Sequence, residues 1–297
     1  MRVETALRQG LELLRAGAIG APALTAELLL AHALHRDRIY LLTHPEYELS
    51  ELEWLHYGRF LHERLKGQPT QYITRTQEFW GRDFHVEKGV LIPRPETEHV
   101  IEQALALLVP ARAMAPPVSQ RVDATDTNLR TTTRVLDIGT GSGILAVTLA
   151  VETKARVCAT EISPDALRIA RANAARLGAH VDFVRCDLGA AFAAAAFDLV
   201  VSNPPYIASA EIDALQREVR EWEPRAALDG GPDGLAVFRR LIPDAARLLR
   251  PGGWLILEIG ATQAESVSGL LGPGWRECTV TPDLAGLPRV VKAQWSP

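Results

Sequence analysis

The chain has 297 residues, of which 47% are hydrophobic and 23% are charged, and its formal net charge is −4. This composition is typical of a soluble globular protein, and the length suffices for two domains. No apolar run approaches the roughly 18 residues that a membrane-spanning helix needs, and the slightly acidic balance does not favour a duplex-DNA-binding protein, which usually carries a basic footprint.

The cysteines and the amino-terminal residues indicate the compartment. Cys158, Cys186 and Cys278 have no paired spacing, which argues against a disulfide framework and against a zinc site. The segment Met1–Glu4 carries an acid early and lacks the apolar stretch of a secretory signal. We therefore expect a cytoplasmic protein that has no metal site and no contact with a membrane.

Residues 1–75 show the spacing of helices. Apolar residues recur at helical intervals from Leu7 to Leu14 and from Leu24 to Leu34, and Ser50 with Glu53 forms a capping box ahead of a third helix. Nine basic side chains balance nine acidic ones in this segment, and no catalytic cluster stands out. The sequence therefore predicts a helical domain over residues 1–75 that recognises a partner or packs on the rest of the chain.

The next segment has a different pattern. Aromatic residues flank Gly81, which predicts a β-hairpin linker over residues 76–93. A helix is then expected to start within Pro93–Thr97 and to end near Leu108. Residues 110–133 are rich in Pro, Ala, Thr and Asp and have no periodicity, so we predict a flexible insertion there.

From Arg134 onward, strand-like and helix-like segments alternate, which predicts an α/β fold with a seven-stranded doubly wound sheet. The domain that contains this sheet is expected to span residues 94–297. The last two strands have a short Pro/Gly connection and should pair antiparallel. The expected strands are 134–138, 156–160, 181–185, 197–202, 253–259, 275–281 and 288–294. The expected helices are 143–151, 164–177, 234–250 and 261–271.

The first of these strands leads into a glycine-rich loop. Its spacing is G-x-G-x-G, whereas a dinucleotide-binding loop reads G-x-G-x-x-G, and Asp137 precedes it. Glycine lets the backbone approach a ligand closely and take positive φ. Because the Asp137 carboxylate would repel a pyrophosphate, we expect a ligand with a cationic amino acid end. The candidate loop residues are Gly139, Thr140, Gly141, Ser142 and Gly143.

Two further strand ends carry side chains suited to an adenosine. Glu161 closes the second strand, where a carboxylate can accept both ribose hydroxyls. Asp187 and Leu188 follow the third strand, so that Asp187 can accept from the adenine amino group while Leu188 packs on the ring. S-adenosylmethionine combines an ammonium, a ribose and an adenine, and this order of features favours it as the cofactor.

The fourth strand ends abruptly at Asn203-Pro204-Pro205-Tyr206. Prolines lack the N–H that a sheet needs, so the chain turns at the carboxyl end of a strand, where open α/β folds bind ligands. Asn203 offers an amide oxygen, Pro204 offers a carbonyl that no neighbouring strand needs, and Tyr206 offers a flat ring. The turn can therefore hold a planar group by the two hydrogens of its NH2.

With the loop and the turn together, the chain resembles the class I methyltransferases that use S-adenosylmethionine. More narrowly, it is similar to the family that N5-methylates the glutamine of class I peptide-chain release factors. Arg75 departs from that pattern where glycine is frequent, as does Pro288 before Arg289 where an acid is usual. The segments that carry the narrower resemblance are Gly67–Ile73, Glu78-Phe79, Leu91–Glu98, Asn203–Tyr206, Glu223–Leu228, Gly230–Gly234, Leu257–Gly260 and Gln263.

The resemblance implies methyl transfer to the side-chain amide nitrogen of the glutamine in the Gly-Gly-Gln motif of release factors, with S-adenosylhomocysteine as the second product. It implies that residues 1–75 recognise the protein substrate. The implied catalytic residues are Asn203, Pro204 and Tyr206, and Pro205 joins them in holding the substrate glutamine. The implied cofactor-binding residues are Gly139, Thr140, Gly141, Ser142, Gly143, Glu161, Asp187, Leu188 and Asn203.

Three other functions are alternatives to this one. An N6-adenine nucleic-acid methyltransferase is the main alternative, because the same turn suits a flipped base. The near-neutral charge of residues 1–75 and the acidic overall balance count against it, so no direct contact with nucleic acid is expected. The glycine spacing and Asp137 disfavour an NAD-dependent oxidoreductase. A non-catalytic binding protein is disfavoured because the loop and the turn are both intact.

Overall fold

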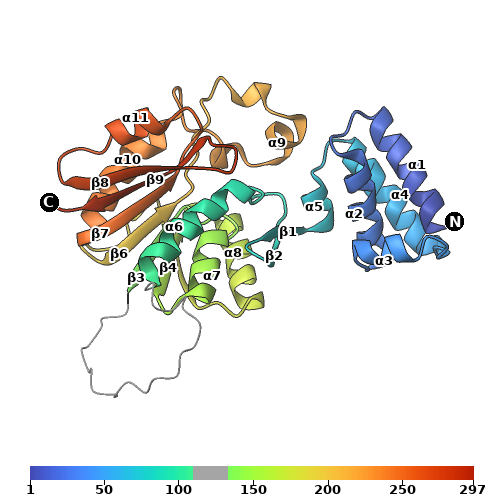
Figure 1. Cartoon of the computed structure of the whole chain (residues 1–297), viewed down its shortest axis with the longest axis horizontal. Coiled ribbons are helices and arrows are strands. Elements are labelled where there is room, and N and C mark those ends of the chain that lie inside the picture. Colours follow the sequence, from blue (N-terminus) through green and yellow to red (C-terminus); the bar gives the residue numbers. More distant parts are fainter. Residues whose placement is uncertain (110–132) are drawn as a thin grey trace, which may run out of the picture.

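The computed structural model describes residues 1–109 and 133–297. Figure 1 shows a small bundle of helices formed by the amino-terminal residues and a larger part in which helices pack on both faces of a sheet. The predicted insertion at 110–133 lies outside the described residues, apart from its last residue. None of the described helices is both long and apolar enough to cross a membrane.

The amino-terminal helices pack around an apolar core of their own, in which Leu14 and Tyr57 are fully buried. The capping box that the sequence predicts is present. The Glu53 amide donates to Ser50 Oγ at 3.3 Å and the Ser50 amide donates to Glu53 Oε2 at 2.7 Å, which fixes the start of the fourth helix. The helices are α1 (Val3–Ala16), α2 (Pro22–Leu34), α3 (Arg38–Thr43), α4 (Glu51–Leu65) and α5 (Thr70–Thr74).

An antiparallel hairpin of β1 (Thr76–Phe79) and β2 (Arg82–His85) follows the helices. Gly81 makes its turn with a φ of +67°, a conformation that glycine adopts without strain. Phe79 and Phe84 are buried in the core of the larger part, so the hairpin fastens the two parts together.

Residues 86–93, which the sequence assigned to the same hairpin linker, form no strand. Val86, Val90 and Ile92 instead bury their side chains in a separate apolar cluster that includes Tyr72. The Tyr72 hydroxyl donates to the Val90 carbonyl at 2.5 Å, which holds this segment against α5. A short 3₁₀ helix, Pro95–Thr97, then leads into α6 (Glu98–Leu108).

The larger part contains the predicted seven-stranded sheet, in the order β5-β4-β3-β6-β7-β9-β8. The first five of these are parallel, whereas β9 runs antiparallel to both of its neighbours. The strand order reverses between β3 and β6, which is where doubly wound sheets bind ligands. The strands are β3 (Arg134–Ile138), β4 (Arg156–Glu161), β5 (Val181–Arg185), β6 (Phe197–Ser202), β7 (Leu249–Glu258), β8 (Trp275–Pro282) and β9 (Pro288–Trp295).

Helices cover both faces of this sheet (Figure 1). One apolar cluster joins α6 and α7 to one face, and a second joins α10 and α11 to the other. The fold class that the sequence predicts is therefore confirmed. The remaining helices are α7 (Ile144–Glu152), α8 (Pro164–Arg176), α9 (Arg217–Trp222), α10 (Ala236–Leu248) and α11 (Ala264–Gly269).

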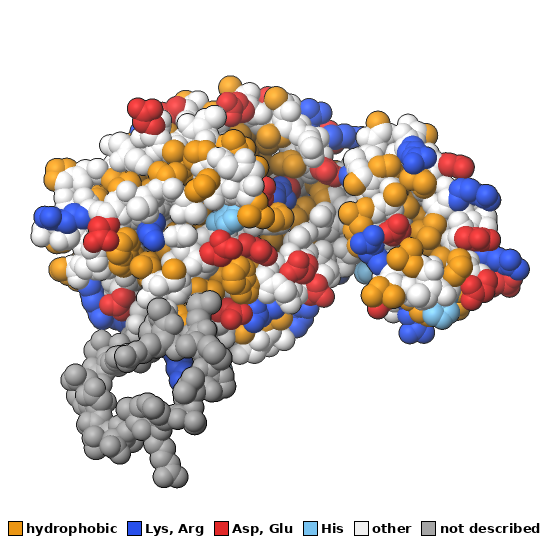
Figure 2. Space-filling view, viewed as in Figure 1, with side chains coloured by type: hydrophobic (Ala, Val, Ile, Leu, Met, Phe, Trp, Pro, Cys, Tyr) orange, Lys and Arg blue, Asp and Glu red, His pale blue; other side chains and the backbone are white. Residues whose placement is uncertain are grey.

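The two parts meet across a narrow waist, which Figure 2 shows as a notch between the amino-terminal helices and the rest. An ion pair between Arg64 of α4 and Glu218 of α9 crosses this waist, and the Arg64 side chain is only 8% exposed. On the face drawn in Figure 2, basic and acidic side chains are interspersed, without a broad patch of one sign.

Candidate functional site

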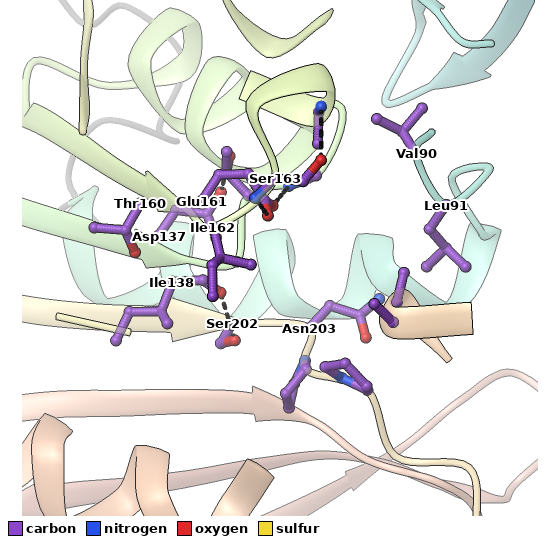
Figure 3. Close-up of a pocket in the computed structure, with 18 of the residues that line it drawn as sticks. Val90, Leu91, Asp137, Ile138, Thr160, Glu161, Ile162, Ser163, Ser202 and Asn203 are labelled. Atoms are coloured by element: carbon purple, nitrogen blue, oxygen red, sulfur yellow. Dashed lines mark hydrogen bonds between the residues drawn. The ribbon is translucent and has the colours of Figure 1, made fainter. Parts of the chain in front are cut away.

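A cavity of about 370 Å³ opens at the carboxyl ends of β3, β4 and β6. Figure 3 shows Glu161 and Asn203 on opposite sides of this space, with Val90 and Leu91 at a third side. Its volume lies within the range of small-molecule sites. It lies at the switch point of the sheet, so the strand order explains why the candidate side chains converge here.

The glycine loop after β3 lines the cavity with four of its five candidate residues, Gly139 to Ser142. Gly139 has a φ of +73° and Gly141 a φ of +56°, and a Cβ atom at either position would meet nothing within 4 Å. The backbone is therefore bare on this side, as a closely approaching ligand requires. Gly143 does not line the cavity: it precedes α7, and a Cβ there would lie 3.2 Å from Ala170.

Asp137 lines the cavity as a buried acid, 1% exposed. Its Oδ2 accepts from the Thr140 hydroxyl at 2.6 Å and from the Ala146 amide at 3.1 Å, whereas no described residue donates to Oδ1. Burial raises the pKa of Asp137 to about 7, and the two hydrogen bonds oppose that rise. An unpaired buried carboxylate oxygen is suited to a cationic ligand group.

Glu161 closes β4, and backbone amides hold its carboxylate in place. Oε2 accepts from the Gly141 amide and Oε1 from the Ser163 amide, both at 2.9 Å. Each oxygen keeps a second lone pair, so the carboxylate can still accept hydroxyl donors from a ligand. The next residue, Ile162, is 61% exposed and projects between Glu161 and Asn203 (Figure 3). Apart from its position after the acid, nothing in the sequence indicates a role for Ile162.

Asp187 and Leu188, at the end of β5, also line the cavity. The Asp187 carboxylate forms an exposed ion pair with Arg240 of α10, which lines the cavity too and was not a candidate from the sequence. Leu188 has a φ of +47°, an unfavourable conformation for a residue with a Cβ. That strained turn places both residues at the cavity wall.

The turn after β6 brings two acceptors to the cavity. Asn203 donates from Nδ2 to Thr97 Oγ1 at 3.1 Å, and no described residue donates to its Oδ1 or to the carbonyl of Pro204. Asn203, Pro204 and Pro205 all line the cavity. Ser202, directly before the turn, donates to the Ile138 carbonyl at 2.7 Å and fixes the strand end against β3.

Tyr206 lies behind the turn and does not line the cavity. Its hydroxyl donates to Glu258 Oε1 at 3.3 Å, and burial followed by the charge of Glu258 raises its pKa. Its carbonyl accepts from Gln263 Nε2 at 2.8 Å. The Tyr206 hydroxyl therefore binds a buried acid and does not face a ligand.

A charged contact closes the side of the cavity formed by residues 92–94. Glu223 is buried, accepts from the Ile92 amide at 3.0 Å and pairs with Arg94 at 2.5 Å. Burial raises the pKa of Glu223, and the Arg94 charge opposes that rise. The pair holds Arg94 and Pro224 at the cavity wall.

The structure thus gathers most of the candidate residues around one cavity. Gly143 and Tyr206 are adjacent to it and act through packing or hydrogen bonds. Sequence reasoning missed Thr97, Ile162, Glu223, Arg240 and Glu258 as parts of the site. Three of these, Thr97, Glu223 and Glu258, lie in segments that carried the family resemblance, so a signal existed for them without a role attached.

Comparisons with known proteins give consistent results. Family models described as the PrmC N-terminal domain and the methyltransferase small domain match residues 5–74 and 122–221. The release factor glutamine methyltransferase of Koribacter versatilis is 45% identical over 293 residues, 98% of each chain. That of Geobacter sulfurreducens is 43% identical over 270 residues, 90% of this chain and 88% of the other. A methyltransferase structure from Pyrococcus furiosus covers 73% of this chain and 90% of its own, at 17% identity and a TM-score of 0.50, which supports the fold.

Proposed function

The chain belongs to the release factor glutamine methyltransferase family, and from this membership we propose that it methylates the side-chain amide nitrogen of the glutamine in the Gly-Gly-Gln motif of class I peptide-chain release factors. The observation that carries the proposal is the pair of vacant acceptors, Asn203 Oδ1 and the Pro204 carbonyl, beside one cavity. A primary amide presents two N–H donors, which match these two acceptors.

The methyl donor in this proposal is S-adenosylmethionine, which supplies an electrophilic methyl group on its sulfonium. The residues present fit it. The unpaired Oδ1 of Asp137 suits the ammonium, Glu161 suits the ribose hydroxyls, and the bare loop at Gly139 and Gly141 leaves room for the chain between them. Asp187, Leu188 and Ile162 then surround the position of the adenine.

The protein contributes mainly positioning and electrostatics. An amide nitrogen is a poor nucleophile because its lone pair is delocalised into the carbonyl. Asn203 Oδ1 and the Pro204 carbonyl accept the two hydrogens of this nitrogen. These two hydrogen bonds direct the nitrogen lone pair across the cavity, and they stabilise the positive charge that develops on nitrogen. The methylated nitrogen is acidic enough to lose its proton afterwards, so the step needs no strong base. Tyr206 supports the turn from behind and excludes water.

The experiment is mass spectrometry after incubation with S-adenosylmethionine and either a class I release factor or unmethylated DNA. We expect one added methyl group on the Gly-Gly-Gln glutamine and none on a release factor with that glutamine changed to alanine. Methylated adenine with an unmodified release factor would instead support the N6-adenine alternative.

Asn203→Ala serves as the variant control in the same assay. It should bind S-adenosylhomocysteine nearly as well as the wild type and lose more than about tenfold in kcat, because one of the two acceptors is gone. If turnover survives within tenfold, Asn203 does not have this role.

A further inference from the structure

Glu258 is a buried acid to which the mechanism above assigns no role. It is the last residue of β7, beside the turn after β6, and it is 1% exposed. Burial raises its pKa to about 7. Hydrogen bonds from Thr97 and Tyr206 and the charge of Arg289 favour the ionised form, and the charge of Glu96 opposes it. Burial of a carboxylate costs free energy of folding unless hydrogen-bond donors surround it. A role for Glu258 beside the turn would explain why this acid is buried there.

The contacts of Glu258 reach both ends of the turn. The Tyr206 hydroxyl donates directly to Oε1. Thr97 is fully buried, and its oxygen accepts from Asn203 Nδ2 at 3.1 Å. A hydroxyl has a single proton, and this acceptor role leaves that proton free to serve Glu258. Glu258 Oε2 is buried and has no hydrogen-bond partner among the described residues, so it is the acceptor that the Thr97 proton can serve. Glu258, Thr97 and Asn203, which come from three distant segments, therefore lie in one row of buried polar groups.

The direction of donation along this row decides which way the Asn203 amide faces. An ionised carboxylate only accepts, so a Thr97 proton directed at Glu258 leaves the Thr97 oxygen to accept from Asn203, as it does in the structure. The NH2 of Asn203 then faces Thr97, and its Oδ1 faces the cavity. With the direction reversed, the NH2 of Asn203 would face the NH2 of the substrate, and one of the two acceptors would be lost.

We propose that Thr97 and Glu258 are positioning residues that fix the amide orientation of Asn203, so that its oxygen meets the substrate nitrogen. This inference rests on the proposed function for its consequence in catalysis. Its structural content, the orientation of the Asn203 amide, is independent of the identity of the acceptor substrate.

Matched variants separate hydrogen-bond direction from packing. Thr97→Val keeps the shape and removes the hydroxyl, Thr97→Ser keeps the hydroxyl, and Glu258→Gln keeps the size and removes the charge. The control is Thr148→Val, because Thr148 of α7 is fully buried and its hydroxyl has no partner among the described residues. Binding of S-adenosylhomocysteine by calorimetry reports whether each variant is folded.

The kinetic expectation is a fall in kcat of about 10- to 100-fold for Thr97→Val and Glu258→Gln, with affinity for S-adenosylhomocysteine within threefold of the wild type. Thr97→Ser should restore most of kcat, and Thr148→Val should match the wild type. In the wild type, kcat should also fall below neutral pH as Glu258 takes up a proton, and this acid limb should be absent in Glu258→Gln.

A second readout needs no methylation. The sequence has three asparagines, Asn128, Asn173 and Asn203, so asparagine-selective ¹⁵N labelling gives three side-chain amide pairs. The Asn203 pair is the one absent from Asn203→Ala. It should move with pH near neutrality in the wild type, and it should lose that movement in Thr97→Val and Glu258→Gln.

The outcomes are distinguishable. Full activity in Thr97→Val, or equal losses in Thr97→Val and Thr97→Ser, would overturn the inference, as would an Asn203 pair unchanged by all three variants. If the wild type fails to methylate the release factor, the proposed function fails, and the amide spectra still decide the orientation. If Thr97→Val does not fold, the Glu258→Gln variant and the pH titration of the wild type still test the orientation of the Asn203 amide.

Discussion

At the scale of single residues, the site depends on buried oxygens that have fewer hydrogen-bond donors than they can accept. Asp137 is the clearest case, because one of its oxygens accepts two hydrogen bonds and the other accepts none from the described residues. Its pKa, raised to about 7 by burial, means that a neutral carboxyl and a carboxylate coexist near neutral pH. A cationic ligand group would favour the carboxylate.

This predicts that S-adenosylhomocysteine, which carries the same ammonium, binds more tightly as the pH rises. The charged fraction of a group with a raised pKa increases through that pKa, so affinity should improve by about five- to tenfold between pH 6 and pH 8. Isothermal titration calorimetry at both pH values measures it. Asp137→Asn should bind more weakly and show little pH dependence, and a wild-type affinity independent of pH would contradict the role of Asp137.

At the scale of elements, the turn after β6 is held by the segment before α10. Gly234, in that segment, has a φ of +73°, and a Cβ there would lie 2.4 Å from the Tyr206 carbonyl oxygen and 2.6 Å from Gln263 Nε2. Gln263 Nε2 is the group that donates to the same carbonyl. Only glycine allows this close approach, so the segment and the turn constrain each other.

Gly234→Ala should therefore reduce both kcat and thermal stability, because the added methyl group pushes the turn out of place. Gly252→Ala is the matched control: it has a φ of +85°, and a Cβ there would meet nothing within 4 Å. The control carries the backbone strain without the crowding. Differential scanning calorimetry and methylation kinetics on both variants compare the two effects, and equal losses would show that crowding at Gly234 is unimportant.

Most elements of the sheet could be predicted because their patterns are long. The seven strands lie close to the seven expected ranges, although β7 begins at Leu249, ahead of the expected 253, where a register shift against β6 extends the pairing. The short helices α3, α5 and α9 have only five or six residues, too few to establish a 3.6-residue period. Their existence depends on caps and contacts, such as Asp37 accepting from the Tyr40 amide at the start of α3.

The site was predictable to the extent that its residues follow strand ends. Glu161 and Asn203 do so, and the topology brings both to one cavity. Thr97 and Glu258 could not be assigned roles, because nothing local in the sequence indicates that they meet at the Asn203–Tyr206 turn. The partners of a buried polar side chain are set by the packing of distant segments, and the sequence does not display that packing.

At the scale of the whole molecule, an ion pair links the helical part to α9 of the larger part. Arg64 of α4 is nearly buried, and its pair with Glu218 of α9 is its main charge compensation. Its other side-chain contact is a donation to the Gln68 carbonyl at 3.2 Å. Because α9 comes shortly before Glu223, which pairs with Arg94, and before Pro224 at the cavity wall, the Arg64–Glu218 pair connects the helical part to the neighbourhood of the site.

Glu218→Gln should destabilise the protein by about 1–2 kcal/mol, less than a fully buried pair would, because the Glu218 side chain is 31% exposed. Hydrogen exchange should increase in α4 and α9 first. Glu221→Gln on the same helix is the control, since its pair with Arg217 is solvent-exposed on both sides and should change stability by less than about 0.5 kcal/mol. If Glu218→Gln and Glu221→Gln change the stability equally, the charge of Arg64 does not need to be compensated by Glu218.

The contact between Ile92 and Glu223 joins residues 131 positions apart, and Asn203 lies 106 positions from Thr97. On a ribosome, these partners are made at very different times. The amino-terminal helices can form from contacts within their own segment as they emerge, whereas the cavity lacks part of its wall until Pro224, Ala227 and the lining residues of α10 have been synthesised. Ligand-binding competence should therefore appear late during translation, because an amino-terminal fragment that ends before α10 lacks part of the cavity wall.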